Sequence, residues 1–115
     1  MSQWSGPFSA QNTTGQTIYN VKISHTASGC PDQTPITATH VSNTNWFGGG
    51  QWQTETTSND NWYWYYNLGS TGGTLITGSK QCNLDKSDNN CFVILTGTGA
   101  SIQPSSSSDC NGSNN

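Results

Sequence analysis

The sequence predicts an all-β protein, an antiparallel β-sandwich of about six to eight short strands. Strand-like segments rich in β-branched and aromatic residues alternate with turn clusters about every 8–12 residues, a spacing typical of sandwiches. No segment has a convincing helical period, and good helix formers are scarce. We expect one sandwich domain over residues 1–104. A Ser- and Asn-rich tail over 105–115 should be mobile unless Cys110 anchors it.

The clearest strand covers residues 17–26, where apolar and polar side chains alternate. Tyr19, Val21 and Ile23 are expected on one face, with Asn20, Lys22 and Ser24 on the other. Residues 34–43 form a weaker predicted strand with Ile36, Ala38 and His40 on one face. The remaining expected elements, in chain order, are a turn at 29–32, a flexible link at 46–50, strands at 51–58 and 62–68, a turn at 70–73, a strand at 74–79, and a strand buried on both faces at 91–96.

The most informative segment is the predicted strand at 62–68, which begins with five successive aromatic residues. Alternation places Trp62, Trp64 and Tyr66 on one face and Tyr63 and Tyr65 on the other. One face must reach the core, and the other would expose aromatic rings, which soluble proteins rarely do without purpose. The alternative is that both faces are covered, because aromatic rings would fill a core that lacks aliphatic side chains.

Composition excludes several functions. Of 115 residues, 53 are Ser, Thr, Asn or Gln, whereas only 16 are Leu, Ile, Val or Phe. Three Lys residues, the absence of Arg and a pI near 4.8 exclude extensive phosphate contacts, so nucleic-acid binding is not expected. No apolar run is long enough for a membrane-spanning helix. The N-terminal residues lack the basic and apolar regions of a signal peptide. The protein is therefore expected to be either cytoplasmic or non-classically secreted, or a mature secreted form.

Four cysteines, Cys30, Cys82, Cys91 and Cys110, are present in no standard metal-binding spacing. Disulfides are favoured because small domains with thin cores often need them. Among three possible pairings we favour Cys82–Cys91, closing a hairpin, together with Cys30–Cys110, tying down the C-terminal tail. If the protein is cytosolic, all four are expected as free thiols. We expect no metal and no cofactor.

The sequence offers little support for catalysis. Glu55 and Asp60 are the two carboxylates nearest the aromatic strand, and no supporting motif surrounds them. His25 and His40 lie on predicted strands, where histidine more often has a structural role than a catalytic one. We therefore expect a protein that is not an enzyme.

Three stretches carry a family resemblance: Thr17-Ile-Tyr-Asn-Val-Lys-Ile-Ser-His25, Thr56-Thr-Ser-Asn-Asp-Asn-Trp-Tyr-Trp64 and Lys80-Gln-Cys-Asn83. They resemble the aegerolysin-like domain of nematode proteins up-regulated in insulin-receptor mutants, over residues 12–104. The resemblance implies a compact antiparallel β-sandwich without a signal peptide. It also implies membrane-lipid binding, often to sphingolipids, alongside a separate pore-forming partner. The composition is also similar to that of small fungal fruiting-body lectins.

The leading functional expectation is a lectin-like protein that binds glycans or glycolipid headgroups. Sugar C–H groups stack on aromatic faces, while sugar hydroxyls require amide, carboxylate and hydroxyl partners. The alternatives are an aegerolysin-like sphingolipid-binding protein acting with a pore former, and a structural or storage protein without a small ligand. A second copy of the chain in a homodimer is a further expected partner. The candidate site residues are Trp52, Trp62, Tyr63, Trp64 and Tyr65 for stacking, and Asn59, Asp60 and Asn61 for hydroxyl groups.

Overall fold

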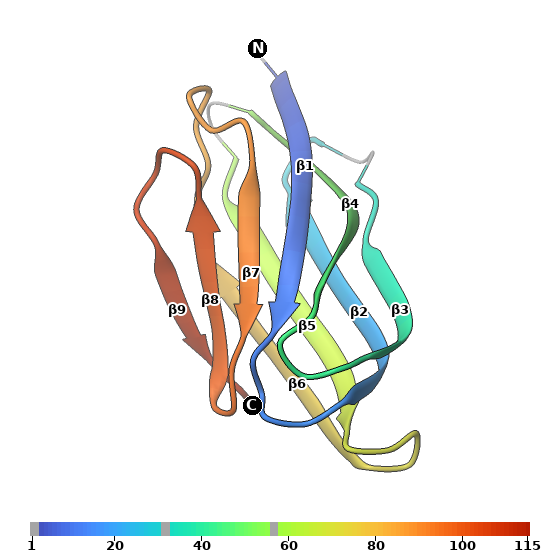
Figure 1. Ribbon diagram of the computed structural model, residues 1–115. Coiled ribbons are helices and arrows are strands. Elements are labelled where there is room, and N and C mark those ends of the chain that lie inside the picture. Colours follow the sequence, from blue (N-terminus) through green and yellow to red (C-terminus); the bar gives the residue numbers. More distant parts are fainter. Residues whose placement is uncertain (1–2, 31–32, 56–57) are drawn as a thin grey trace.

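The protein is a β-sandwich of two packed sheets, as the sequence predicts (Figure 1). The computed structural model describes residues 3–30, 33–55 and 58–115. Within these ranges the chain forms nine strands and no helix. The strands are β1 (Gln3–Asn12), β2 (Ile18–Ala27), β3 (Ile36–Val41), β4 (Trp46–Glu55), β5 (Asp60–Leu68), β6 (Thr74–Gln81), β7 (Cys91–Leu95), β8 (Gly99–Pro104) and β9 (Cys110–Ser113).

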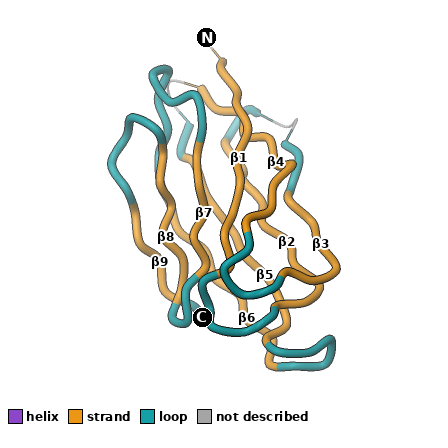
Figure 2. Tube along the Cα trace, in the orientation of Figure 1, coloured by secondary structure: helices purple, strands orange, loops and turns teal. Residues whose placement is uncertain are grey.

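One layer has five strands in the order β4-β1-β7-β8-β9, and the other has four in the order β3-β2-β5-β6 (Figure 2). Neighbouring strands are antiparallel except β1 and β7, which are parallel. Both edges of the sandwich are bridged. Thr34 pairs with Gln51 on one side, and Gly78 pairs with Asn114 on the other. These bridges restrain how far the two layers can separate.

The six expected strands correspond to β2 through β7. The structure also has three further strands, and it differs from the prediction at residues 46–50 and in the burial of β7. β1, β8 and β9 are additional strands: Gly and Pro interrupt the pattern of β1, and β8 and β9 are short. The expected flexible link at 46–50 is instead the first half of β4, held by pairing with β1. The expected double-sided burial of β7 is also wrong, since Phe92 and Ile94 are only partly buried. Residues 31–32 of the expected turn and 56–57 of the expected strand and family motif lie outside the described ranges.

A β-bulge changes which side chains of β2 and β3 face the core. Asn20 has a positive φ of 53°, and the register of β2 against β5 shifts between Tyr19 and Lys22. Tyr19 therefore leaves the face shared by Val21 and Ile23, and it pairs with the exposed His40 on β3. Both face assignments made from strict alternation, Tyr19 and His40, are consequently wrong.

Aromatic side chains fill the core, and glycines make space for them. Trp52, Trp64 and Phe8 each lie directly across from a glycine on the neighbouring strand: Gly6, Gly78 and Gly50. A methyl group on Gly78 would lie 2.2 Å from the Trp64 ring, and one on Gly50 would lie 2.4 Å from the Phe8 ring. The large rings thus cover positions where the partner strand has no side chain, which explains how a chain poor in aliphatic residues packs its interior.

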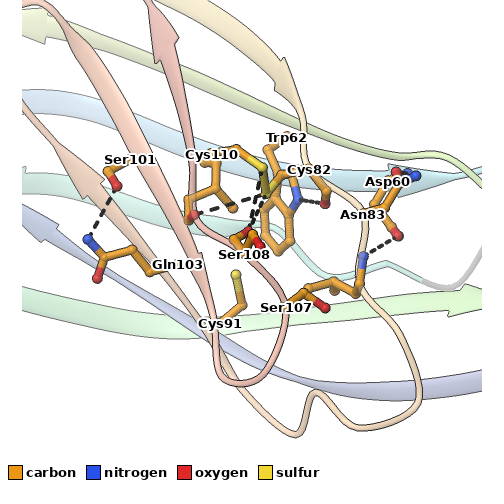
Figure 3. Close-up of a disulfide and its surroundings, with 12 residues drawn as sticks. Asp60, Trp62, Cys82, Asn83, Cys91, Ser101, Gln103, Ser107, Ser108 and Cys110 are labelled. Carbon is orange, nitrogen blue, oxygen red and sulfur yellow. Dashed lines mark hydrogen bonds between the residues drawn. A yellow bond between two sulfur atoms is a disulfide. The ribbon is translucent and has the colours of Figure 1, made fainter.

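The disulfide joins Cys82 to Cys110, so both predicted pairings are wrong (Figure 3). Cys82 follows β6 in one layer and Cys110 begins β9 in the other, and their Cα atoms are 5.8 Å apart. The segment 83–90 passes from one sheet to the other, so it is not the hairpin that a Cys82–Cys91 bond would require. Cys91 and Cys30 are buried free thiols. Cys110 does anchor the C-terminal segment, through Cys82 rather than Cys30.

Asp88 provides a second anchor for the C-terminal segment. Its carboxylate accepts hydrogen bonds from the Ser107 hydroxyl and from the backbone N–H groups of Asp85, Ser106 and Ser107. Burial opposes ionisation of Asp88, but these hydrogen bonds outweigh it and lower the pKa of the carboxyl group. The Asp88 carboxylate therefore stabilises the connection between β8 and β9 while it remains ionised.

Candidate functional site

Three of the predicted stacking residues are in the core. Trp52, Trp62 and Trp64 are 0, 0 and 1 % exposed. Each indole N–H already has a partner within the protein: the carbonyl oxygens of Pro7 and Cys82 for Trp52 and Trp62, and Oδ1 of Asn114 for Trp64. In this structure, these rings have no surface on which a ligand could stack.

The other face of β5 is open to solvent. Tyr63 and Tyr65 are 42 and 44 % exposed, which identifies the outward face that the sequence left undecided. The strand register gives both rings polar neighbours. Ser24 and Ser79 flank Tyr63, and Lys22 and Thr77 flank Tyr65. We call this surface the tyrosine face: Tyr63, Tyr65, Lys22, Ser24, Thr77 and Ser79.

A shallow hollow lies next to the tyrosine face. Its volume is about 290 Å³, and its polar lining comes from Asn20, Thr37 and Thr39 on β2 and β3. Thr37 pairs with Lys22, which in turn pairs with Tyr65, so the hollow continues the row of side chains across the sheet. Asn20 Nδ2 donates to Oδ1 of Asn67 at 2.9 Å, which holds the bulge against β5.

The predicted polar residues are divided between surface and interior. Asn59 is exposed just before β5, and Asn61 is half-buried on the same side of β5 as Tyr63. Asp60 is fully buried and points into the sandwich instead. Asn59 and Asn61 are therefore accessible from solvent, whereas Asp60 is not.

Asp60 belongs to a buried polar network with His25. Oδ1 of Asp60 lies 2.7 Å from Nε2 of His25, and Oδ2 accepts the backbone N–H of Leu84 at 2.8 Å. Nδ1 of His25 lies 2.9 Å from Oε1 of Gln33. The Gln33 amide nitrogen donates to the carbonyl oxygens of Cys30 and Gln53, which connects the network to β4 of the other sheet.

The hydrogen-bond pattern limits where the protons of this network can be. Because the Gln33 nitrogen donates to two carbonyls, its Oε1 must be the acceptor, so Nδ1 of His25 carries a proton. Nε2 of His25 and Oδ1 of Asp60 then share one further proton between them. The pair is neutral as a unit, which is compatible with complete burial, and its contacts tie the two sheets together.

Three of the four groups considered for catalysis, Glu55, Asp60 and His25, are buried, whereas His40 is exposed. Burial, followed by the nearby Glu55 and Asp60 carboxylates, raises the pKa of the Cys30 thiol despite a hydrogen bond with Ser58. Burial likewise raises the pKa of the Cys91 thiol, with Asp88 adding to the effect. Protonated, buried thiols are poor nucleophiles.

One exposed aromatic residue was not among the predicted site residues. Trp46 begins β4, is 54 % exposed, and makes a T-shaped contact with Phe92 at a ring-centroid distance of 5.5 Å. Because residues 46–50 are predicted as a flexible link, Trp46 is not among the candidate residues. Burial alternates along β7, and Phe92 is one of its partly buried residues. Phe92 therefore lies on the outer surface of the five-stranded sheet, beside Trp46.

Comparison with models of known protein families gives no match, and comparison with curated proteins gives none either. In the part of the chain that the structure describes, no helix is both long and apolar enough to cross a membrane.

Proposed function

We propose that the protein is a non-enzymatic, lectin-like protein that binds neutral glycans or glycolipid headgroups on the tyrosine face. The observation that carries this proposal is the pair of exposed rings, Tyr63 and Tyr65, at the centre of a paired sheet and bordered by hydroxyl and amide groups. Tyrosine supplies a large, amphipathic contact area with few rotatable bonds, so little conformational entropy is lost on binding.

The strand arrangement suits a sugar ligand in two respects. Tyr63 and Tyr65 lie on alternate positions of one strand, so their side chains are about 7 Å apart along the strand direction and can contact neighbouring parts of one glycan. The hydroxyl groups of Ser24, Thr77 and Ser79 and the hollow at Asn20, Thr37 and Thr39 supply donors and acceptors beside the rings. Pairing on both sides of β5 holds these groups in position before the ligand arrives.

A glycan array followed by competition with the free sugar tests this proposal. We expect saturable binding by the wild-type protein and at least a tenfold loss for the Tyr63→Ser/Tyr65→Ser variant. The matched control is Tyr63→Phe/Tyr65→Phe, which retains both rings and should retain most of the affinity. Equal binding by the serine variant and the wild-type protein would exclude the tyrosine face as the site.

A second candidate function, sphingolipid binding alongside a pore-forming partner, is favoured by Leu75. This side chain is 51 % exposed and lies across from Asn67 at the end of the tyrosine face. An exposed leucine, two tyrosines and one lysine are a combination suited to a membrane interface. Pelleting with liposomes that contain or lack sphingomyelin and sterol tests it. Leu75→Ser should reduce pelleting without affecting free-sugar binding, whereas pelleting that ignores lipid composition would argue against a lipid headgroup ligand.

A further inference from the structure

The outer surface of the five-stranded sheet carries a second exposed aromatic group, Trp46. Its contact with Phe92 supports the indole from one side while more than half of the residue remains exposed. Phe92 and Ile94 on β7 are partly buried on the same surface. An indole held against a sheet in this way presents a rigid apolar platform.

A row of paired residues leads from Trp46 across the whole sheet. Trp46 pairs with Gln11, Gln11 with Ile94, Ile94 with Ser101, and Ser101 with Asn111. Four inter-strand steps make this row about 19 Å long. We call it the tryptophan face: Trp46, Gln11, Ile94, Ser101, Asn111 and the adjoining Phe92.

The far end of the tryptophan face is hollowed. The hollow has a volume of about 220 Å³ and is lined by hydroxyl and amide groups from Thr96, Thr98, Ser101, Asn111 and Ser113. Gln103 donates to the Ser101 hydroxyl at 3.2 Å, which adds a further amide beside it. None of these described lining residues is charged. An indole platform leading to an uncharged, hydroxyl-lined hollow suits a neutral oligosaccharide better than an ionic ligand.

We infer that the tryptophan face is a second binding site for neutral oligosaccharides, so that one monomer bridges two glycans. Figure 1 shows the two sheets as separate layers. The tyrosine face lies on the outer surface of the four-stranded sheet and the tryptophan face on that of the five-stranded sheet, so the two sites point away from each other. Bridging rests on the proposed function of the tyrosine face, whereas sugar binding by the tryptophan face does not. A chain with two such sites cross-links glycan-bearing surfaces without forming a dimer.

Two measurements test this inference: the number of glycans bound per monomer, and the agglutination of glycan-coated beads. The glycans are those that bind on the array, and sedimentation shows that the protein is monomeric. The wild-type monomer should bind two glycans and agglutinate beads. Trp46→Ser and Tyr63→Ser/Tyr65→Ser should each bind one and raise the minimum agglutinating concentration at least tenfold. The triple variant should bind none. Trp46→Tyr keeps an aromatic platform and should retain agglutination, and thermal unfolding confirms that each variant is folded.

The outcomes separate the two proposals. If Trp46→Ser binds as many glycans and agglutinates as well as the wild type while the tyrosine variant loses binding, the second site is overturned and the tyrosine face stands. If Trp46→Ser binds none and the tyrosine variant binds as the wild type does, the tryptophan face stands and the proposed function of the tyrosine face fails. If the wild-type protein binds no glycan on the array, both are overturned.

Discussion

Strand β5 has two aromatic faces in contrasting environments. Trp62, Trp64 and Tyr66 face inward at 0–1 % exposure, whereas Tyr63 and Tyr65 face outward and are more than two-fifths exposed. The inward indoles have hydrogen-bond partners within the protein, and Trp64 lies over a glycine. The outward rings stand among short hydroxyl side chains instead. One aromatic segment thus forms the core with one face and leaves a candidate ligand surface on the other.

The largest effect should come from Trp64→Ala. It removes a buried ring between the sheets and leaves Oδ1 of Asn114 without its donor, so the free energy of unfolding should fall by about 3–5 kcal/mol. Tyr65→Ala, the adjacent outward residue, should cost much less. Urea unfolding of both variants measures the difference, and equal losses would contradict the assignment of the two faces.

Loss of the disulfide should have the next largest effect. Cys110→Ser opens a bond that spans 28 residues and holds β9 beside Trp64, so stability should fall by about 3–4 kcal/mol. Cys91→Ala is the matched control, because it changes a buried thiol that forms no disulfide. Reducing agent should destabilise the wild-type protein and the control but leave Cys110→Ser unaffected. An equal response of all three proteins would place the disulfide elsewhere.

Gly78→Ala tests whether the glycines determine how the inner rings pack. The added methyl group would meet the Trp64 ring at 2.2 Å, so overpacking should cost about 1–3 kcal/mol. Ser79→Ala, one residue along β6 and on the outer surface, should change stability by less than about 0.5 kcal/mol. Thermal unfolding distinguishes them, and a neutral Gly78→Ala variant would show that Trp64 has room to move.

Asp88→Asn should produce the smallest loss, about 1 kcal/mol at neutral pH, because the amide replaces one charged acceptor oxygen with a donor. The pKa of Asp88 is lowered in the folded protein, so its contribution is complete above about pH 4 and declines as pH falls through the lowered value. Wild type and variant should therefore converge in stability in acid. A gap that stayed constant down to pH 2 would argue that the Asp88 charge is not involved.

Local alternation in the sequence predicted the sandwich and most of its strands, because period-two patterning in β2 and β5 is a local property. It could not decide which face of β5 is buried, since both faces are aromatic and the decision depends on Gly78 and β9, far along the chain. The bulge at Asn20 depends on a positive φ that no local pattern revealed. The disulfide pairing depends on how residues 83–90 pass between the sheets, so loop length alone predicted the wrong partners.

The most direct test of the tyrosine face is a glycan titration of two proteins that both carry Trp46→Ser, one with Tyr63 and Tyr65 intact and one with Tyr63→Ser/Tyr65→Ser. The titrant is the glycan that binds best on the array. We predict saturable binding that weakens at least tenfold when the tyrosines are replaced, while the unfolding midpoint moves little because both rings are exposed. Unchanged affinity in a variant that folds normally would contradict the account of β5 as a strand with one structural and one ligand-binding face.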